Sequence, residues 1–134
     1  MNVRSLVKVS TAILSITFIA HAFNHPEIEW KTVATKHFRI HYYSATEPLL
    51  YATWRIAEEA YETLAPLYRY AFVEKINITL ADYDDYSNGW ADWSARNIGI
   101  WVPDAMFELR GNSTWIRNVI CHELAHIMSI EKRR

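Results

Sequence analysis

Five consecutive residues near the end of the chain, His122-Glu123-Leu124-Ala125-His126, combine two metal-ligating imidazoles with a carboxylate. On an α-helix, residues four apart lie on one side, about 6 Å apart along the axis. His122 and His126 could therefore bind one ion, with Glu123 projecting beside it. Zn²⁺ lowers the pKa of a bound water to about 7 in catalytic sites, and a nearby carboxylate can accept its proton. The spacing predicts two zinc ligands and a general base.

The residues around this motif predict a helix. Residues 111–114 supply a turn, in which Asn112 or Ser113 can cap the first free N–H groups. Apolar residues then recur as far as Met128 without Pro or Gly, which predicts four or more turns of buried helix. Buried imidazoles and carboxylates need partners, and a metal provides one. The alternative is that the histidines are hydrogen-bonded core residues and Glu123 caps a neighbour.

A catalytic zinc usually has three protein ligands, and the third is not evident. The longer motif HExxHxxGxxH is excluded, because Ser129 and Lys132 stand where it needs Gly and His. Glu131 lies too close on the same helix. Three upstream histidines are weaker candidates: His25, His37 and His41. We therefore expect the third ligand beyond Arg134, and this chain to be part of a longer enzyme or a truncated copy of one.

The first 22 residues have the pattern of a secretory signal peptide. Arg4 and Lys8 precede an uncharged apolar stretch at residues 9–20, and Ala20-His21-Ala22 is a small-x-small cleavage site. The stretch is shorter than the ~20 residues of a spanning helix. We expect export to the periplasm, the cell envelope or the medium, with membrane contact only through this segment. A transmembrane anchor and a buried first helix are the alternatives.

Residues 23–134 suffice for one modest domain. The net charge of the chain is −1 and no basic stripe is present, which argues against a nucleic-acid partner. The single Cys121 cannot form an intrachain disulfide. It is best interpreted as a small core residue rather than a ligand.

Between the two ends, hydrophobic periodicity predicts an α+β fold. Residues 37–43 alternate as in a strand, and residues 50–68 carry apolar side chains at helical spacing. Residues 44–47 suit a capping box, and Pro66 should kink or end the helix. Two further strands are predicted at residues 76–80 and 97–102.

The acidic segment at residues 82–90 resembles a calcium-binding loop only superficially. Tyr86 and Ser87 occupy a ligand position and the glycine position, and no Glu stands at the twelfth place. We interpret the segment as a solvated, turn-rich loop. Alternatively, Trp90 and Trp93 line a substrate cleft.

The chain resembles the N-terminal half of gluzincin metallopeptidases of clan MA, and more closely bacterial exported proteins in which such a domain precedes a Tol-type β-propeller. The matching segments, between about residues 30 and 130, are HFRIHYY, AEEAYETLAPLY, KINITLADYDDYSNGWA, NIGIWV and WIRNVICHELAHI. The resemblance implies a zincin-like subdomain: a small mixed sheet, a long helix and a buried HExxH helix. It also implies zinc bound by His122 and His126, Glu123 as catalytic base, and a β-propeller domain beyond this chain.

The resemblance further implies that a sheet-edge strand binds an extended peptide or protein substrate. That strand comprises Asn97, Ile98, Gly99, Ile100, Trp101 and Val102. The family's third ligand, a Glu on a following helix, has no counterpart here. The expected function is zinc-dependent peptide hydrolysis by an exported enzyme whose domain, residues 23–134, is incomplete at its C-terminus. The alternative is a non-catalytic zincin-like binding or scaffold module of the cell envelope.

Overall fold

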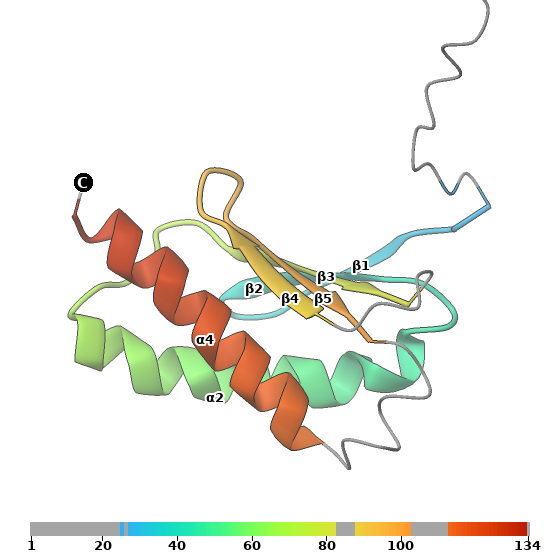
Figure 1. Ribbon diagram of the computed structural model, residues 1–134, viewed down its shortest axis with the longest axis horizontal. Coiled ribbons are helices and arrows are strands. Elements are labelled where there is room, and N and C mark those ends of the chain that lie inside the picture. The colour runs from blue at the N-terminus through green and yellow to red at the C-terminus, as the bar shows by residue number, and fades with distance from the viewer. Residues whose placement is uncertain (1–24, 26, 83–87, 103–112, 134) are drawn as a thin grey trace, which may run out of the picture.

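One sheet of five strands, with two long helices on one of its faces, forms the structure (Figure 1). The computed structural model describes residues 25, 27–82, 88–102 and 113–133. In chain order its elements are β1 (Lys31–Ala34), β2 (Phe38–Tyr42), the 3₁₀ turn η1 (Glu47–Leu49), α2 (Leu50–Tyr68), β3 (Ile76–Ala81), β4 (Asn88–Asp92), β5 (Asn97–Trp101) and α4 (Ser113–Glu131). The predicted α+β class is confirmed.

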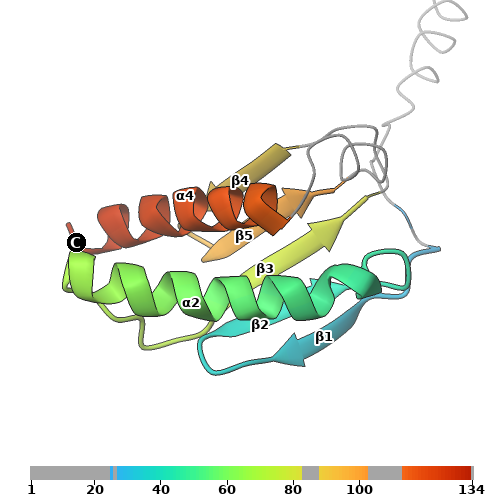
Figure 2. The ribbon, with the colours of Figure 1, turned by 90° about the horizontal axis from the view of Figure 1, so that it is seen from below.

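The sheet is mixed, with strand order β1-β2-β3-β5-β4. The three inner strands β2, β3 and β5 are parallel, whereas β1 and β4 are antiparallel to their neighbours and lie at the two edges. Helix α2 makes the crossover between β2 and β3 that a parallel pair requires (Figure 2). The predicted mixed sheet is therefore present.

The prediction that residues 97–102 form a sheet-edge strand is wrong. β5 pairs with β3 on one side and with β4 on the other. The edge strand on this side of the sheet is β4, whose first three residues were interpreted as part of a loop because Asn88 and Gly89 favour turns. The chain reverses after Asp92, whose carboxylate accepts hydrogen bonds from the backbone N–H groups of Ser94 and Ala95. The resulting hairpin places β4 outside β5.

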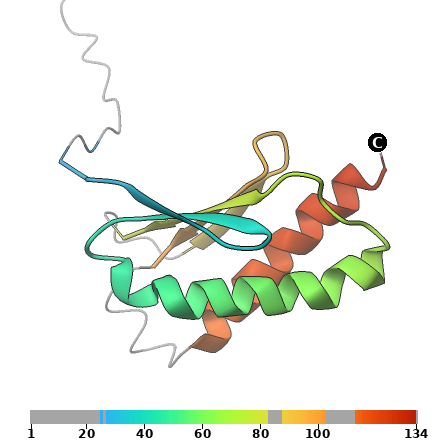
Figure 3. The same ribbon diagram turned by 180° about the vertical axis from the view of Figure 1, so that it is seen from behind.

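The core lies between the sheet and the two helices. Alternate residues of the parallel strands face the helices and are fully buried, as the alternation predicted. They include Phe38, Ile40, Ile76, Ile78, Leu80, Ile98 and Ile100. Helices α2 and α4 pack against each other and against this face, while the opposite face of the sheet carries no described helix (Figure 3).

The start of α2 differs from the prediction, whereas its end agrees with it. No side chain caps the helix; the 3₁₀ turn η1, with Pro48 in its first positions, leads directly into it. The predicted capping box is therefore absent, and the Thr46 hydroxyl instead accepts a hydrogen bond from the Tyr43 N–H at 3.2 Å. Pro66 lies within the last turn of α2. The helix ends at Tyr68, where Arg69 adopts a left-handed conformation with φ 50°.

The C-terminal end of α4 is held by a group of side chains from three distant segments. The Glu131 carboxylate accepts hydrogen bonds from Arg96 Nε and from the Tyr70 hydroxyl, both at 2.7 Å. The Glu131 side chain is only 9% exposed. The bond to this carboxylate also raises the pKa of Tyr70. We call these three residues the Glu131 clasp; it joins α4 to the β4–β5 loop and to the segment after α2.

Glu58 of α2 anchors the β1–β2 turn. Its carboxylate accepts hydrogen bonds from the Thr35 hydroxyl at 2.5 Å and the His37 backbone N–H at 2.9 Å, and it pairs with the His37 ring at 2.6 Å. Burial alone would raise the pKa of the Glu58 carboxyl. The hydrogen bonds from Thr35 and His37 outweigh that effect, so the pKa lies below its ordinary value of 4.5.

Replacing Glu58 by Gln is expected to lower the free energy of unfolding near neutral pH by about 1–3 kcal/mol. Because the folded-state pKa is depressed, the carboxylate stabilises the fold above 4.5, and this stabilisation is lost as pH falls through the folded-state pKa. Urea unfolding of both proteins should therefore show a difference that shrinks in acid. Glu62→Gln is the control, since Glu62 is 66% exposed and lies 3.8 Å from Lys36. An equal loss at both pH values would contradict the assignment.

Several predictions concern residues outside the part of the chain that the structure describes. They include the signal peptide at residues 1–22, the helix cap at Asn112, and Tyr86 and Ser87 of the acidic loop. Among the described residues, no helix has the length and apolar content that crossing a membrane requires.

Candidate functional site

His122 and His126 both lie on the solvent-exposed side of α4. The prediction that this helix is buried around most of its circumference is therefore wrong. Successive helical residues are about 100° apart, so Leu124, two positions after His122, points to nearly the opposite side. The apolar residues that pack inward are Ile116, Ile120, Leu124, Ile127 and Met128, each fully buried. The imidazoles are thus accessible to an ion without a large desolvation cost.

The two imidazoles converge on one point. His122 Nε2 and His126 Nε2 are 2.9 Å apart, and their rings meet edge to face with centroids 4.5 Å apart and planes at 82°. Two nitrogens bound to one tetrahedral zinc at about 2.0–2.1 Å would be about 3.3 Å apart. A small outward movement of the rings therefore suffices. The pair fits two of the positions in a zinc coordination shell.

Glu123 faces a shallow hollow between α4 and the edge strand β4. The hollow has a volume of about 360 Å³ and is lined by Asn88, Gly89, Trp115, Asn118, Val119, His122 and Glu123. Gly89 allows the two elements to approach, because a Cβ there would lie 2.2 Å from Val119 Cγ1. The carboxylate and one imidazole of the motif therefore border the same space, beside an edge of the sheet.

The described residues contain no group of three or more His, Cys, Asp or Glu side chains that could hold a metal ion. His41 projects from the other face of the sheet, where it bonds to Thr32 and Asn77 at 2.9 and 3.1 Å. His25 contacts Glu27 at 3.0 Å. Glu131 is engaged in the Glu131 clasp. The structure therefore brings none of these predicted alternatives to the histidine pair.

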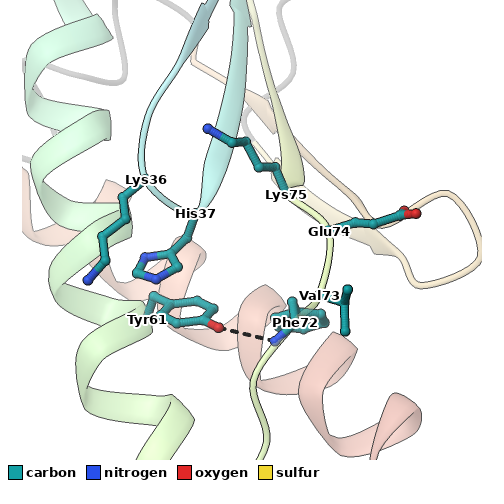
Figure 4. A pocket seen from close by; sticks show the side chains of 7 residues that line it. All are labelled: Lys36, His37, Tyr61, Phe72, Val73, Glu74 and Lys75. Atoms are coloured by element: carbon teal, nitrogen blue, oxygen red, sulfur yellow. Dashed lines mark hydrogen bonds between the residues drawn. The ribbon is translucent and has the colours of Figure 1, made fainter.

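His37, the remaining upstream histidine, lines a different cavity of about 120 Å³ (Figure 4). Its ring stacks on Tyr61 at 3.8 Å and 13° and pairs with Glu58. Both lysines at this cavity already have interaction partners. Lys36 lies near Glu62, and Lys75 donates a hydrogen bond to the Thr35 carbonyl oxygen. His37 thus has a structural role in joining the β1–β2 turn to α2.

None of residues 97–102, predicted to bind substrate, lines the hollow. Ile98 and Ile100 are core residues and Val102 is 4% exposed. Asn97, Gly99 and Trp101 alternate with them and belong to the opposite face. The residues that do line the hollow from the sheet, Asn88 and Gly89, were missed. Asp92 followed by Ser94, a pairing suited to a tight loop, was the available indication of a hairpin.

Comparison of the chain with protein-family models, with curated proteins and with solved structures found no significant match. The function of this site is therefore inferred from its chemistry: two convergent imidazoles, one carboxylate and an adjacent sheet edge.

Proposed function

We propose that this domain is the N-terminal part of a zincin-like metallopeptidase that hydrolyses peptide bonds outside the cytoplasm. One observation carries the proposal. The Nε2 atoms of His122 and His126 lie 2.9 Å apart on the exposed side of α4, while Glu123, one residue along, lines the hollow beneath β4. Two imidazoles that could bind one metal ion, a carboxylate that could act as base, and a space for substrate are therefore adjacent.

Each residue has a defined role in this proposal. His122 and His126 would hold zinc, which when bound polarises the scissile carbonyl and lowers the pKa of the attacking water. Glu123 accepts the proton from that water and delivers it to the departing amine. A third ligand, from a residue outside the part of the chain that the structure describes, would complete the site in this proposal.

β4, rather than residues 97–102, is the strand proposed to bind the substrate backbone. It pairs with β5 on one side only among the described strands. An extended peptide can add to such an edge through main-chain hydrogen bonds. A peptide bound there would run alongside the hollow that Glu123 and His122 line.

Calorimetric titration of the 134-residue chain with zinc tests the metal site directly. With two protein ligands we expect binding weaker than about 1 μM, lost in His122→Ala and in His126→Ala. Glu123→Gln should leave it unchanged, because Glu123 is not a ligand. His41→Ala is the matched control, since His41 lies on the other face of the sheet. Tighter binding that His41→Ala removes would show that the ligand set is wrong.

The alternative to a peptidase is a non-catalytic zincin-like module that binds or supports a partner in the cell envelope. The lack of a third ligand among the described residues favours it. Downstream coding sequence separates the two functions. A continuing reading frame that encodes a helix with a Glu supports the enzyme, and a genuine stop codon after Arg134 supports the binding module.

A further inference from the structure

The face of the sheet opposite the helices carries a band of uncharged polar and aromatic side chains. Strand register places Thr32, His41, Thr79, Gly99 and Trp90 in one row across all five strands. This row alternates with the buried row that contains Ile40, Ile78 and Ile98, so it points away from the core. Figure 1 shows no described helix on that side.

Two indoles form one end of this face. Trp90 packs closely against Gly99: a Cβ at Gly99 would be only 2.2 Å from Trp90 Nε1. The ring of Trp101 is 5.9 Å from that of Trp90, at 40°. Trp90 is 37% exposed, so part of its ring is accessible. The absence of a side chain at Gly99 is what allows the indole to lie across β5.

Hydrogen bonds order the polar side chains beside the indoles. The Thr79 hydroxyl donates to Asn97 Oδ1 at 3.2 Å. Asn77 Oδ1 contacts His41 Nε2 at 3.1 Å, and His41 Nδ1 contacts the Thr32 hydroxyl at 2.9 Å. Each amide also has an NH₂ group with two donors. The face therefore offers fixed donors and acceptors next to an aromatic surface.

The charge of this face limits what it can bind. Among the described strand residues that the register places on this outer face, Arg39 and Asp92 are the ones that carry a formal charge. Asp92 already accepts hydrogen bonds from Ser94 and Ala95. Nucleic acids bind largely through phosphate neutralisation by several Lys or Arg side chains, and the described strands place only Arg39 of this kind on this face. An uncharged ligand with both an apolar face and many hydroxyls fits best.

We propose that this outer face binds a neutral saccharide chain. A sugar ring has a C–H face that packs on an indole, and its hydroxyls match the amide, hydroxyl and imidazole groups of Asn77, Asn97, Thr79 and His41. One sugar unit would lie on Trp90 and Trp101, and the following units would cross β5, β3 and β2. This site is on the opposite face from His122 and does not depend on the proposed peptidase function.

The test is a titration of the whole 134-residue chain with cellohexaose and with chitohexaose, followed in ¹H–¹⁵N spectra. The six tryptophans give separate indole signals. We expect those of Trp90 and Trp101 to shift saturably with one of the saccharides, while that of Trp54 stays in place. Trp90→Ala should weaken binding by at least about tenfold. Trp54→Ala, at an indole 41% exposed on α2, is the matched control and should bind normally.

A second variant keeps the test decisive if Trp90→Ala fails to fold. Thr79→Val preserves side-chain shape but removes the hydroxyl that orders Asn97, and it should also weaken binding. Three results would overturn the proposal: no shift of Trp90 or Trp101 with either saccharide, equal weakening by Trp54→Ala, or shifts produced only by a single-stranded dT oligonucleotide or by raising the protein concentration.

Discussion

Glu123→Gln, introduced into a longer chain that carries this domain, is expected to keep its zinc and to lose about 10²–10⁴-fold in peptide turnover. The amide fills the same space in the hollow beneath β4 but cannot accept the proton of the attacking water. His122→Ala and His126→Ala should lose both zinc and activity, because each removes one of the two convergent nitrogens. Elemental analysis of zinc and cleavage of a peptide library separate the two effects.

Glu62→Gln is the control for this series, because Glu62 is an exposed carboxylate on α2. It should change neither zinc content nor turnover. If Glu123→Gln cleaved peptides at the wild-type rate, Glu123 would not be the base. If the intact protein held zinc and cleaved nothing, the site would belong to a binding module instead.

Gly89→Ala should lower the free energy of unfolding by about 1–3 kcal/mol, the usual range for overpacking. The added Cβ would lie 2.2 Å from Val119 Cγ1 and 3.6 Å from Val119 Cβ. Valine in a helix strongly prefers one rotamer, so the methyl group cannot easily turn away. β4 must instead move off α4, which would also widen the hollow beside Glu123.

The matched test is the double variant with Val119→Ala. Removing the Val119 methyl groups leaves the new Cβ at an ordinary van der Waals distance of 3.6 Å. Gly89→Ala should therefore cost much less in a Val119→Ala background than in the wild type, as urea unfolding of the four proteins would measure. Equal costs in both backgrounds would mean that β4 does not pack on α4 as described.

Local sequence patterns predicted the elements that form the core. β2, β3 and β5 show apolar residues in alternation or in a continuous run, and α2 shows helical spacing over Leu50–Tyr68. β1 and β4 were missed. β1 has four residues, and β4 includes Asn88, Gly89 and Asp92, whose turn preferences hide a strand. Their pairing comes from neighbouring strands, which a local pattern does not contain.

The candidate site was likewise predicted where it depends on local sequence and missed where it depends on the whole sheet. The motif placed His122, Glu123 and His126 together because four-residue spacing is a local property of a helix. The exposure of the histidines was predicted wrongly. The number of apolar residues in the helix suggested burial on all sides, but their angular positions place them mainly on one side. The edge strand was misassigned because an edge is a property of the whole sheet order, in which β4 adds outside β5.

The Glu131 clasp has a consequence for how α4 opens. The last turn of a helix normally frays, since its carbonyl groups lack partners within the helix. Here Glu131 is bonded to Arg96 and to Tyr70, residues separated from it by 35 and 61 positions. Local opening of this turn must also release the β4–β5 loop and the segment after α2. The end of α4 is therefore tied to the sheet through these bonds, and its backbone amides should exchange with solvent more slowly than those of an unsupported last helical turn.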